Sequence, residues 1–143
     1  MKFKLAYMDT AKRFAELSHA RRKKVGAIIV KDDRILSIGY NGTPSGWDND
    51  CEYEIDGEYV TKREVLHAEA NALAKLTKST ENSTNAMMFV TLSPCFECSK
   101  NIYSAGISEV YYSEEYRDMS GIKFLEQCGV IIEKMVTTKP RTT

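Results

Sequence analysis

The chain lacks long apolar segments and lacks an excess of charge of either sign. Apolar runs such as residues 25–30 are short, whereas a membrane span requires roughly 18 consecutive apolar residues. The 20 Lys and Arg residues balance the 20 Asp and Glu residues, so the formal net charge is zero. A neutral chain with 43% hydrophobic residues differs from disordered segments and from proteins that coat polyanions. We therefore expect no membrane and no long nucleic acid among its partners.

Cysteine is also sparse, with four residues in a chain of 143. That number is too small for a disulfide scaffold, and in a reducing cytosol closely spaced cysteines more often bind metal or carry out redox chemistry. Near the N-terminus, Lys2, Lys4 and Asp9 interrupt the apolar residues before the core of a secretory signal can develop. These features predict a soluble, cytoplasmic protein in which the spacing of the cysteines is informative.

The length predicts one domain with one hydrophobic core and excludes a multi-domain arrangement. We place this single domain over residues 1–136. Residues 137–143 are expected to form a polar C-terminal tail.

Hydrophobic periodicity predicts the elements of the first half of the domain. Apolar residues at helical spacing indicate a helix over residues 3–17. Residues 25–30 and 35–40 indicate two strands joined as a hairpin. Residues 41–60 contain Gly, Pro and a cluster of acids, so we expect a long loop that shapes a site.

The second half is expected to alternate between helices and strands. Thr61 and Glu64 form a capping-box pattern at the start of a helix over residues 64–78. A strand over residues 86–92 is followed by Ser93, which is expected to be the N-cap of the next helix.

The remaining expected elements are a strand over 110–113, a helix over 119–128 and a strand over 130–133. This order predicts an α/β fold, a three-layer α/β/α sandwich with a five-stranded mixed sheet. Ligands of such folds bind at the carboxyl ends of the strands.

Two cysteines with metal-ligand spacing stand at the start of a predicted helix. Cys95 and Cys98, taken alone, fit a zinc site, a catalytic disulfide or simple packing. His67 lies 28 residues upstream of Cys95, at the start of another predicted helix. Because both helices follow strands of one sheet, their N-termini can meet at one edge. The three side chains then supply one imidazole and two thiolates, a catalytic zinc set.

Glu69 is the candidate catalytic group beside these ligands. Helix N-termini carry partial positive charge, which favours the thiolate form of the cysteines. Zinc in this set would lower the pKa of a water molecule in its fourth coordination position. Glu69 lies two positions from His67, so on a regular helix it does not share the ligand face. We expect it to act instead as a general acid and base.

The sequence resembles the cytidine deaminase superfamily. His67-Ala68-Glu69 and Pro94-Cys95-Phe96-Glu97-Cys98 match the signature of zinc nucleobase deaminases, H-x-E followed by P-C-x-x-C. Within the superfamily it is most similar to the deoxycytidylate deaminases, through residues 24–30, 39–44, 67–72, 90–95 and 106–110. The resemblance implies a cytidine deaminase-like fold and hydrolysis of dCMP to dUMP and ammonia.

The resemblance also implies further roles for residues of the site. Asn41 would bind the sugar hydroxyl of the substrate. The Ser93 carbonyl and the Ala68 backbone would orient the edge of the base, and Tyr116 would stack on the ring. One catalytic Zn²⁺ per chain is expected, because Cys51 lacks the partners that hold a second, structural zinc in some phage members.

An effector site is the remaining feature that the resemblance implies. The Gly-Tyr-Asn-Gly segment is associated in this family with activation by dCTP and inhibition by dTTP in a homohexamer, and Mg²⁺ would accompany a triphosphate. The residues carried over for this site are Lys24, Gly39, Tyr40, Asn41 and Gly42.

Charge is distributed unevenly along the chain. Residues 1–24 hold eight basic and two acidic side chains, whereas residues 48–69 hold eight acidic and two basic ones. These segments are expected to attract each other between subunits. The basic run over residues 21–24 either contacts nucleotide phosphates or forms a solvated helix end.

Alternative functions remain open on the sequence alone. A polynucleotide deaminase acting on tRNA or single-stranded DNA shares the same zinc chemistry, although the neutral charge disfavours it. A non-catalytic nucleotide-binding protein with structural zinc is disfavoured by the carboxylate of Glu69. A thioredoxin-like redox protein would use Cys95 and Cys98 as a disulfide.

Overall fold

The computed structural model describes residues 2–135, and the predicted tail over 137–143 lies outside the described residues. In chain order the elements are α1 (Lys2–Ala15), β1 (Gly26–Lys31), β2 (Arg34–Tyr40), β3 (Glu52–Ile55), β4 (Glu58–Thr61), α2 (Ala68–Leu76), β5 (Met87–Leu92), α3 (Phe96–Ser104), β6 (Glu109–Glu114), α4 (Ser120–Gln127) and β7 (Ile131–Lys134). No helix among residues 2–135 is both long and apolar enough to span a bilayer.

The main sheet has five strands in the order β2-β1-β5-β6-β7. β1 pairs antiparallel with both β2 and β5. β5, β6 and β7 pair in parallel, so a helix connects each of these strands to the next. The predicted five-stranded mixed sheet is confirmed.

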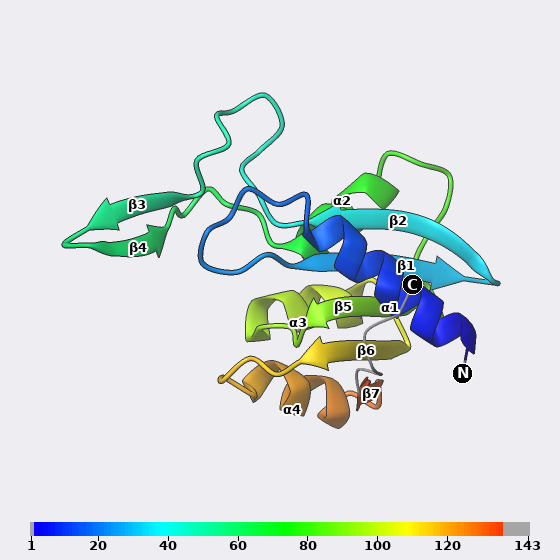
Figure 1. Cartoon of the computed structure of the whole chain (residues 1–143). Helices are drawn as coiled ribbons and strands as arrows, with labels where there is room; N and C mark the ends of the chain where they lie inside the picture. Colours follow the sequence, from blue (N-terminus) through cyan, green and yellow to red (C-terminus); the bar gives the residue numbers. More distant parts are fainter. Residues whose placement is uncertain (1, 136–143) are drawn as a thin grey trace.

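Helices cover both faces of this sheet (Figure 1). Along β1, Ile28 and Val30 face one side, where they pack with Phe89 and residues of α1. Ala27 and Ile29 face the other side, within the core formed with α2, α3 and α4. This alternation is that of a strand buried on both faces. The three-layer α/β/α arrangement is therefore confirmed.

Two glycines allow helices to approach the sheet closely. A Cβ atom on Gly39 would lie 2.4 Å from the carbonyl oxygen of Ala68, at the start of α2. One on Gly26 would lie 2.1 Å from the carbonyl oxygen of Ala11 in α1. Both contacts are to backbone atoms, which cannot rotate away. Gly39 thus sets the distance between β2 and the N-terminus of α2.

Several chain segments converge at one edge of the sheet. β2 and β5 both pair antiparallel with β1, so they run in the same direction, as does β6. Their carboxyl ends therefore meet, together with the chain that leads into β1. Three loops begin at this edge, with Asn41 after β2, Ser93 after β5 and Glu115 after β6. This edge is where ligands of such sheets bind.

The predicted loop over residues 41–60 is in part a β-hairpin, so that prediction is wrong. β3 and β4 pair antiparallel in a separate two-stranded sheet that projects from the body of the domain (Figure 1). Asp56 and Gly57 form the turn with φ of 50° and 81°. Positive φ at both central residues matches the twist of the flanking strands, and Asp-Gly is a favoured pair for it.

Two predicted helix starts also need correction. α2 begins at Ala68 rather than at Glu64, and Thr61 belongs to β4 instead of a capping box. The reason is a bridge between Gly42 and Leu66, whose backbone groups exchange two hydrogen bonds of 3.1 and 2.7 Å. These bonds hold the segment before α2 in an extended conformation.

The N-cap of α3 is Cys95 rather than Ser93, and its sulfur accepts a hydrogen bond from the backbone N–H of Cys98. α1 ends at Ala15, two residues earlier than predicted. Cys95, a candidate metal ligand, therefore lies at the N-terminus of α3, which is the positive end of the helix dipole.

Candidate zinc site and active-site cavity

The predicted metal ligands are brought together at the start of α2 and α3. His67 is the N-cap residue of α2, and Cys95 is the N-cap residue of α3. His67 Nδ1 lies 3.2 Å from Cys98 Sγ and 3.6 Å from Cys95 Sγ. All three donor atoms lie within 4.8 Å of one another. The sequence spacing therefore corresponds to one compact cluster.

This cluster fits zinc. Zinc binds sulfur at about 2.3 Å and imidazole nitrogen at about 2.0 Å, so a sulfur and a nitrogen on one tetrahedral ion lie about 3.6 Å apart. The two sulfur-to-Nδ1 distances, 3.2 and 3.6 Å, are close to this value. Soft thiolates with one imidazole also form a set that favours zinc over hard cations. Three protein donors leave one position of a tetrahedral ion for a water molecule.

The ionisation of the two cysteines is coupled. Hydrogen bonds from the Cys98 thiol and from His67 lower the pKa of Cys95 to about 4. The same bond to Cys95, together with burial, raises the pKa of Cys98. The hydrogen bond to Cys95 also raises the pKa of His67. A dication bound by both sulfurs would displace any thiol proton, since zinc binds the thiolate form.

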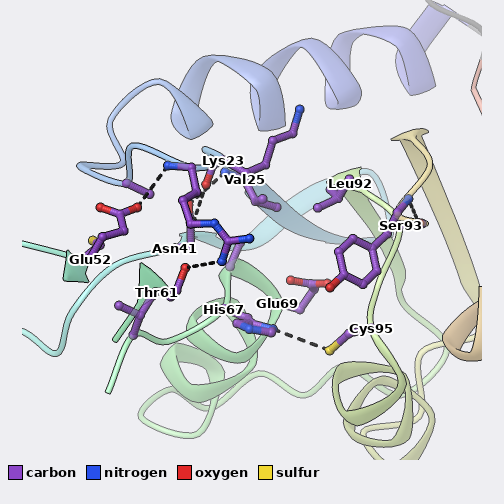
Figure 2. Close-up of a pocket in the computed structure, with 16 residues that line it drawn as sticks. Lys23, Val25, Asn41, Glu52, Thr61, His67, Glu69, Leu92, Ser93 and Cys95 are labelled. Carbon is purple, nitrogen blue, oxygen red and sulfur yellow. Dashed lines mark hydrogen bonds between the residues drawn. The ribbon is translucent and has the colours of Figure 1, made fainter. Parts of the chain in front are cut away.

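Glu69 lies one residue into α2 and faces the cavity beside this cluster (Figure 2). Glu69 has only 4% of its surface exposed to solvent. Burial raises the pKa of the Glu69 carboxyl to about 7. A carboxyl group that exchanges a proton near neutral pH suits general acid and base catalysis.

The cavity around Glu69 has a volume of about 340 Å³. The residues predicted to bind the substrate all line it together with His67 and Cys95: Asn41, Ala68, Ser93 and Tyr116. They come from four segments that are distant in the sequence and meet at the edge of the sheet. The structure brings these residues together, while their individual contacts with a substrate stay predictions.

Hydrogen bonds hold two of these residues in place. Asn41 Oδ1 accepts from the backbone N–H of Val25 at 2.9 Å, and Asn41 Nδ2 donates to the carbonyl of Lys23 at 2.8 Å. Ser93 Oγ accepts from the backbone N–H of Tyr116 at 2.7 Å. Asn41 therefore connects the end of β2 to the start of β1, and among residues 2–135 the structure records one acceptor, the Lys23 carbonyl, for its two amide hydrogens. Ser93 holds the loop that carries Tyr116.

A second cavity, of about 370 Å³, lies on the other side of Asn41 and is lined by three of the predicted effector residues. They are Tyr40, Asn41 and Gly42, joined by Asn71 and Lys75 of α2. Lys24 and Gly39 lie outside the lining of both cavities. Gly39 instead packs against the backbone of α2.

The structure adds residues of the Glu69 cavity that the sequence did not assign to it. Arg22 and Lys23 line this cavity and not the second one, together with Glu52 and Thr61 from the base of the projecting hairpin. The sequence makes the basic run over residues 21–24 a candidate for phosphate contacts, but the position of this run in the Glu69 cavity depends on the pairing of β1 with β5. Glu52 and Thr61 carried no signal, since they were assigned to a loop and to a helix cap.

Comparisons with known proteins agree with this geometry. Residues 1–114 match the family described as "Cytidine and deoxycytidylate deaminase zinc-binding region". The chain is 34% identical over 143 residues to a deoxycytidylate deaminase of Saccharomyces cerevisiae, and the match covers 94% of this chain and 46% of the yeast protein. It is 34% identical over 150 residues to the Homo sapiens deoxycytidylate deaminase, and that match covers 88% of this chain and 82% of the human protein.

A solved structure shows the same fold. The crystal structure of dCMP deaminase from the cyanophage S-TIM5, in complex with dCMP and dUMP, superposes with a TM-score of 0.89. The two chains are 52% identical, and the match covers 94% of this chain and 97% of the other. The predicted resemblance is confirmed, and the chain belongs to the cytidine and deoxycytidylate deaminase family, within which it matches the deoxycytidylate deaminases.

Proposed function

We propose that the protein is an enzyme that hydrolyses dCMP to dUMP and ammonia. The observation that carries this proposal is the placement of Glu69, buried beside three zinc donors in a cavity large enough for a nucleotide base. The relatives named deoxycytidylate deaminase, and the similar structure solved with dCMP and dUMP, support the choice of substrate.

The reaction replaces the exocyclic amine of cytosine by an oxygen atom from water. Bound zinc would supply a water of lowered pKa at the open coordination position. Glu69 accepts one proton from the attacking water and transfers it to N3 of the ring as the C4–O bond forms. It then takes the second proton from the same oxygen and gives it to the exocyclic nitrogen, so that the C4–N bond breaks and ammonia leaves. One carboxyl group serves both halves of the reaction because it returns to its starting form.

The other cavity residues orient the base and sugar. Asn41 binds the sugar hydroxyl with an amide hydrogen, whereas the Ser93 carbonyl and the Ala68 backbone contact the base edge. Tyr116 stacks on the ring. The common cavity of these residues with Glu69 supports the assignments.

Regulation by nucleotides is part of the proposal. dCTP activates and dTTP inhibits by binding, with Mg²⁺, in the second cavity beside Tyr40, Asn41 and Gly42. Asn41 lines both cavities, so a ligand that moves it in one changes the other. Lys24 and Gly39 belong to this site through the resemblance alone.

We also propose a homohexamer in the cytoplasm. The projecting hairpin exposes four large apolar side chains to solvent, Tyr53, Ile55, Tyr59 and Val60. Such a surface is typical of an interface between chains. The four free cysteines are consistent with a reducing compartment.

Ammonia release from cytidine, deoxycytidine, CMP and dCMP tests the proposal. The zinc-loaded protein is assayed with each substrate alone and with dCTP or dTTP. We expect dCMP to have the highest kcat/KM, dCTP to increase its turnover and dTTP to decrease it. Ammonia from none of these compounds would contradict the proposed activity.

A further inference from the structure

Two parallel strands end at the Glu69 cavity, and Ser93 is the first residue beyond one of them. Leu92 of β5 and Glu114 of β6 form the last register pair between these strands. One further bond continues the ladder, because the backbone N–H of Ser93 donates to the carbonyl of Glu114 at 2.8 Å. Pro94 comes next and has no N–H to donate, so the ladder ends there. Ser93 is therefore the residue at which the sheet opens into the cavity.

A side chain makes the bond that would follow in this ladder. In a parallel pair, a residue donates to one residue of the partner strand and accepts from the residue two positions further on. Since Ser93 donates to Glu114, the N–H of Tyr116 would in a regular ladder donate to the Ser93 carbonyl. In this structure the N–H of Tyr116 donates to Ser93 Oγ instead, at 2.7 Å. The hydroxyl thus takes the place of the main-chain acceptor of its own residue.

This exchange leaves the carbonyl of Ser93 without its usual donor. Among residues 2–135 the structure records no hydrogen bond to this oxygen. Ser93 is buried and lines the Glu69 cavity, and Figure 2 shows it on the side that holds Cys95, away from Thr61. A buried carbonyl without a donor costs free energy unless a bound molecule supplies one. The carbonyl is therefore suited to accept from an N–H group of a ligand.

Cytosine offers such a donor, and uracil does not. The exocyclic amine of cytosine carries N–H groups, whereas an oxopyrimidine has an oxygen acceptor at the same ring position. An accepting carbonyl at the base edge therefore distinguishes the substrate of the proposed reaction from its product. The N–H of Tyr116 would compete with the amine for this carbonyl. Ser93 Oγ satisfies that N–H at a different atom.

We infer that the Ser93 hydroxyl is a positioning group that keeps the Ser93 carbonyl available to the exocyclic amine, so that the site binds an aminopyrimidine nucleotide more tightly than the oxopyrimidine product. The same hydrogen bond fixes the backbone of Tyr116, which also lines the cavity. This inference rests on the proposed deamination. It assigns to the side chain of Ser93 a role separate from that of its carbonyl.

The test measures the binding of dCMP and dUMP by calorimetry. The proteins are zinc-loaded and carry Glu69→Gln, so that dCMP is expected to be turned over only slowly. Ser93→Ala removes the hydroxyl and lets the Tyr116 N–H bind the carbonyl. From the contribution of a neutral hydrogen bond, we expect the Kd for dCMP to increase about 5- to 10-fold and the Kd for dUMP to change less than about 2-fold. Ser93→Thr keeps a hydroxyl at the same position and retains the original ratio of the two constants.

Ser83→Ala is the matched control for the loss of a buried hydroxyl. Ser83 is also buried, and its Oγ donates to the carbonyl of Ala105 at 2.7 Å. Ser83 precedes β5, whereas Ser93 follows it, and Ser83 is not among the residues that line the Glu69 cavity. We expect Ser83→Ala to lower the thermal melting temperature without changing either Kd. In proteins that retain Glu69, Ser93→Ala is expected to raise KM for dCMP while kcat changes little.

Three results would overturn the inference while leaving the deamination intact: an unchanged Kd for dCMP in Ser93→Ala, an equal loss for dCMP and dUMP, or an equal effect of Ser83→Ala. Failure of the wild-type, zinc-loaded protein to deaminate dCMP would instead reject the proposed function.

Amide hydrogen exchange at Tyr116 supplies a test that does not require Ser93→Ala to fold. It is measured in the zinc-loaded protein that carries Glu69→Gln and keeps Ser93. If the hydroxyl is the acceptor, the Tyr116 N–H stays protected when dCMP binds. Loss of protection would show that the amine displaces this N–H from the carbonyl, and it would overturn the inference.

Discussion

Replacing Glu69 by Gln is expected to reduce turnover strongly and, in the metal-free protein, to increase stability at alkaline pH. The substitution keeps the shape of the side chain but removes its ability to move a proton. General acid and base catalysis contributes about 10²- to 10⁴-fold to rate. Because Glu69 serves in both halves of the reaction, we expect a loss of kcat near the upper end of this range.

The stability effect follows from the burial of Glu69. Burial raises the pKa of this carboxyl from 4.5 to about 7, so the folded protein favours the neutral form. The unfolding free energy of the wild type therefore decreases as the pH rises from 4.5 through about 7. At about 1.4 kcal/mol per pH unit, the decrease is about 3 kcal/mol. Gln does not ionise and does not incur this loss.

Urea denaturation of the metal-free proteins measures this difference. The unfolding free energies of Glu69→Gln and wild type are compared at about pH 4 and about pH 8. The unfolding free energy of the variant minus that of the wild type is expected to increase by about 3 kcal/mol from the lower to the higher pH. Glu97→Gln serves as control, because the Glu97 side chain in the first turn of α3 is 78% exposed. If the difference in unfolding free energy between Glu69→Gln and wild type does not change with pH, the burial assigned to Glu69 is refuted. If Glu69→Gln turns over dCMP at the wild-type rate, the proposed proton transfer is refuted.

Three further substitutions test other parts of the structure. Cys95→Ser removes one thiolate and is expected to lose bound zinc by metal analysis, whereas retention of one zinc per chain would argue against the cluster. Gly39→Ala introduces a Cβ atom 2.4 Å from the carbonyl oxygen of Ala68 and is expected to cost about 3 kcal/mol in chemical denaturation. Gly42→Ala is its control, since no atom lies within 4 Å of the added Cβ, and equal effects would contradict the packing of α2. Glu52→Ala leaves two backbone N–H groups without their acceptor and should lower the unfolding free energy by about 2 kcal/mol; unchanged stability would show that this anchor is dispensable.

The convergence of His67, Cys95 and Cys98 beside Glu69 was predictable, because a metal site of this kind requires particular residue types at short spacings. Two cysteines with two residues between them, combined with a histidine two positions before a carboxylate, form the signature of zinc nucleobase deaminases. The main sheet was predictable for a related reason. Its strands are short apolar runs bounded by turns, and alternation with helices permits few topologies.

The projecting hairpin and the cavity wall were harder to predict. Asp56-Gly57 is a recognised hairpin signal, but the acidic residues around it resembled a loop. Arg22 and Thr61 meet across 39 residues of sequence, through pairings that no local pattern encodes. Similarly, the extended segment before α2 depends on a bridge to Gly42, which overrides the local capping-box pattern.

Zinc K-edge X-ray absorption of the zinc-loaded protein tests the central claim most directly. His67, Cys95, Cys98 and one water predict two sulfur atoms at about 2.3 Å and two nitrogen or oxygen atoms at about 2.0 Å. That result would leave one coordination position open to solvent beside Glu69. A third sulfur in the first coordination sphere, or none, would contradict the proposed site and the deamination derived from it.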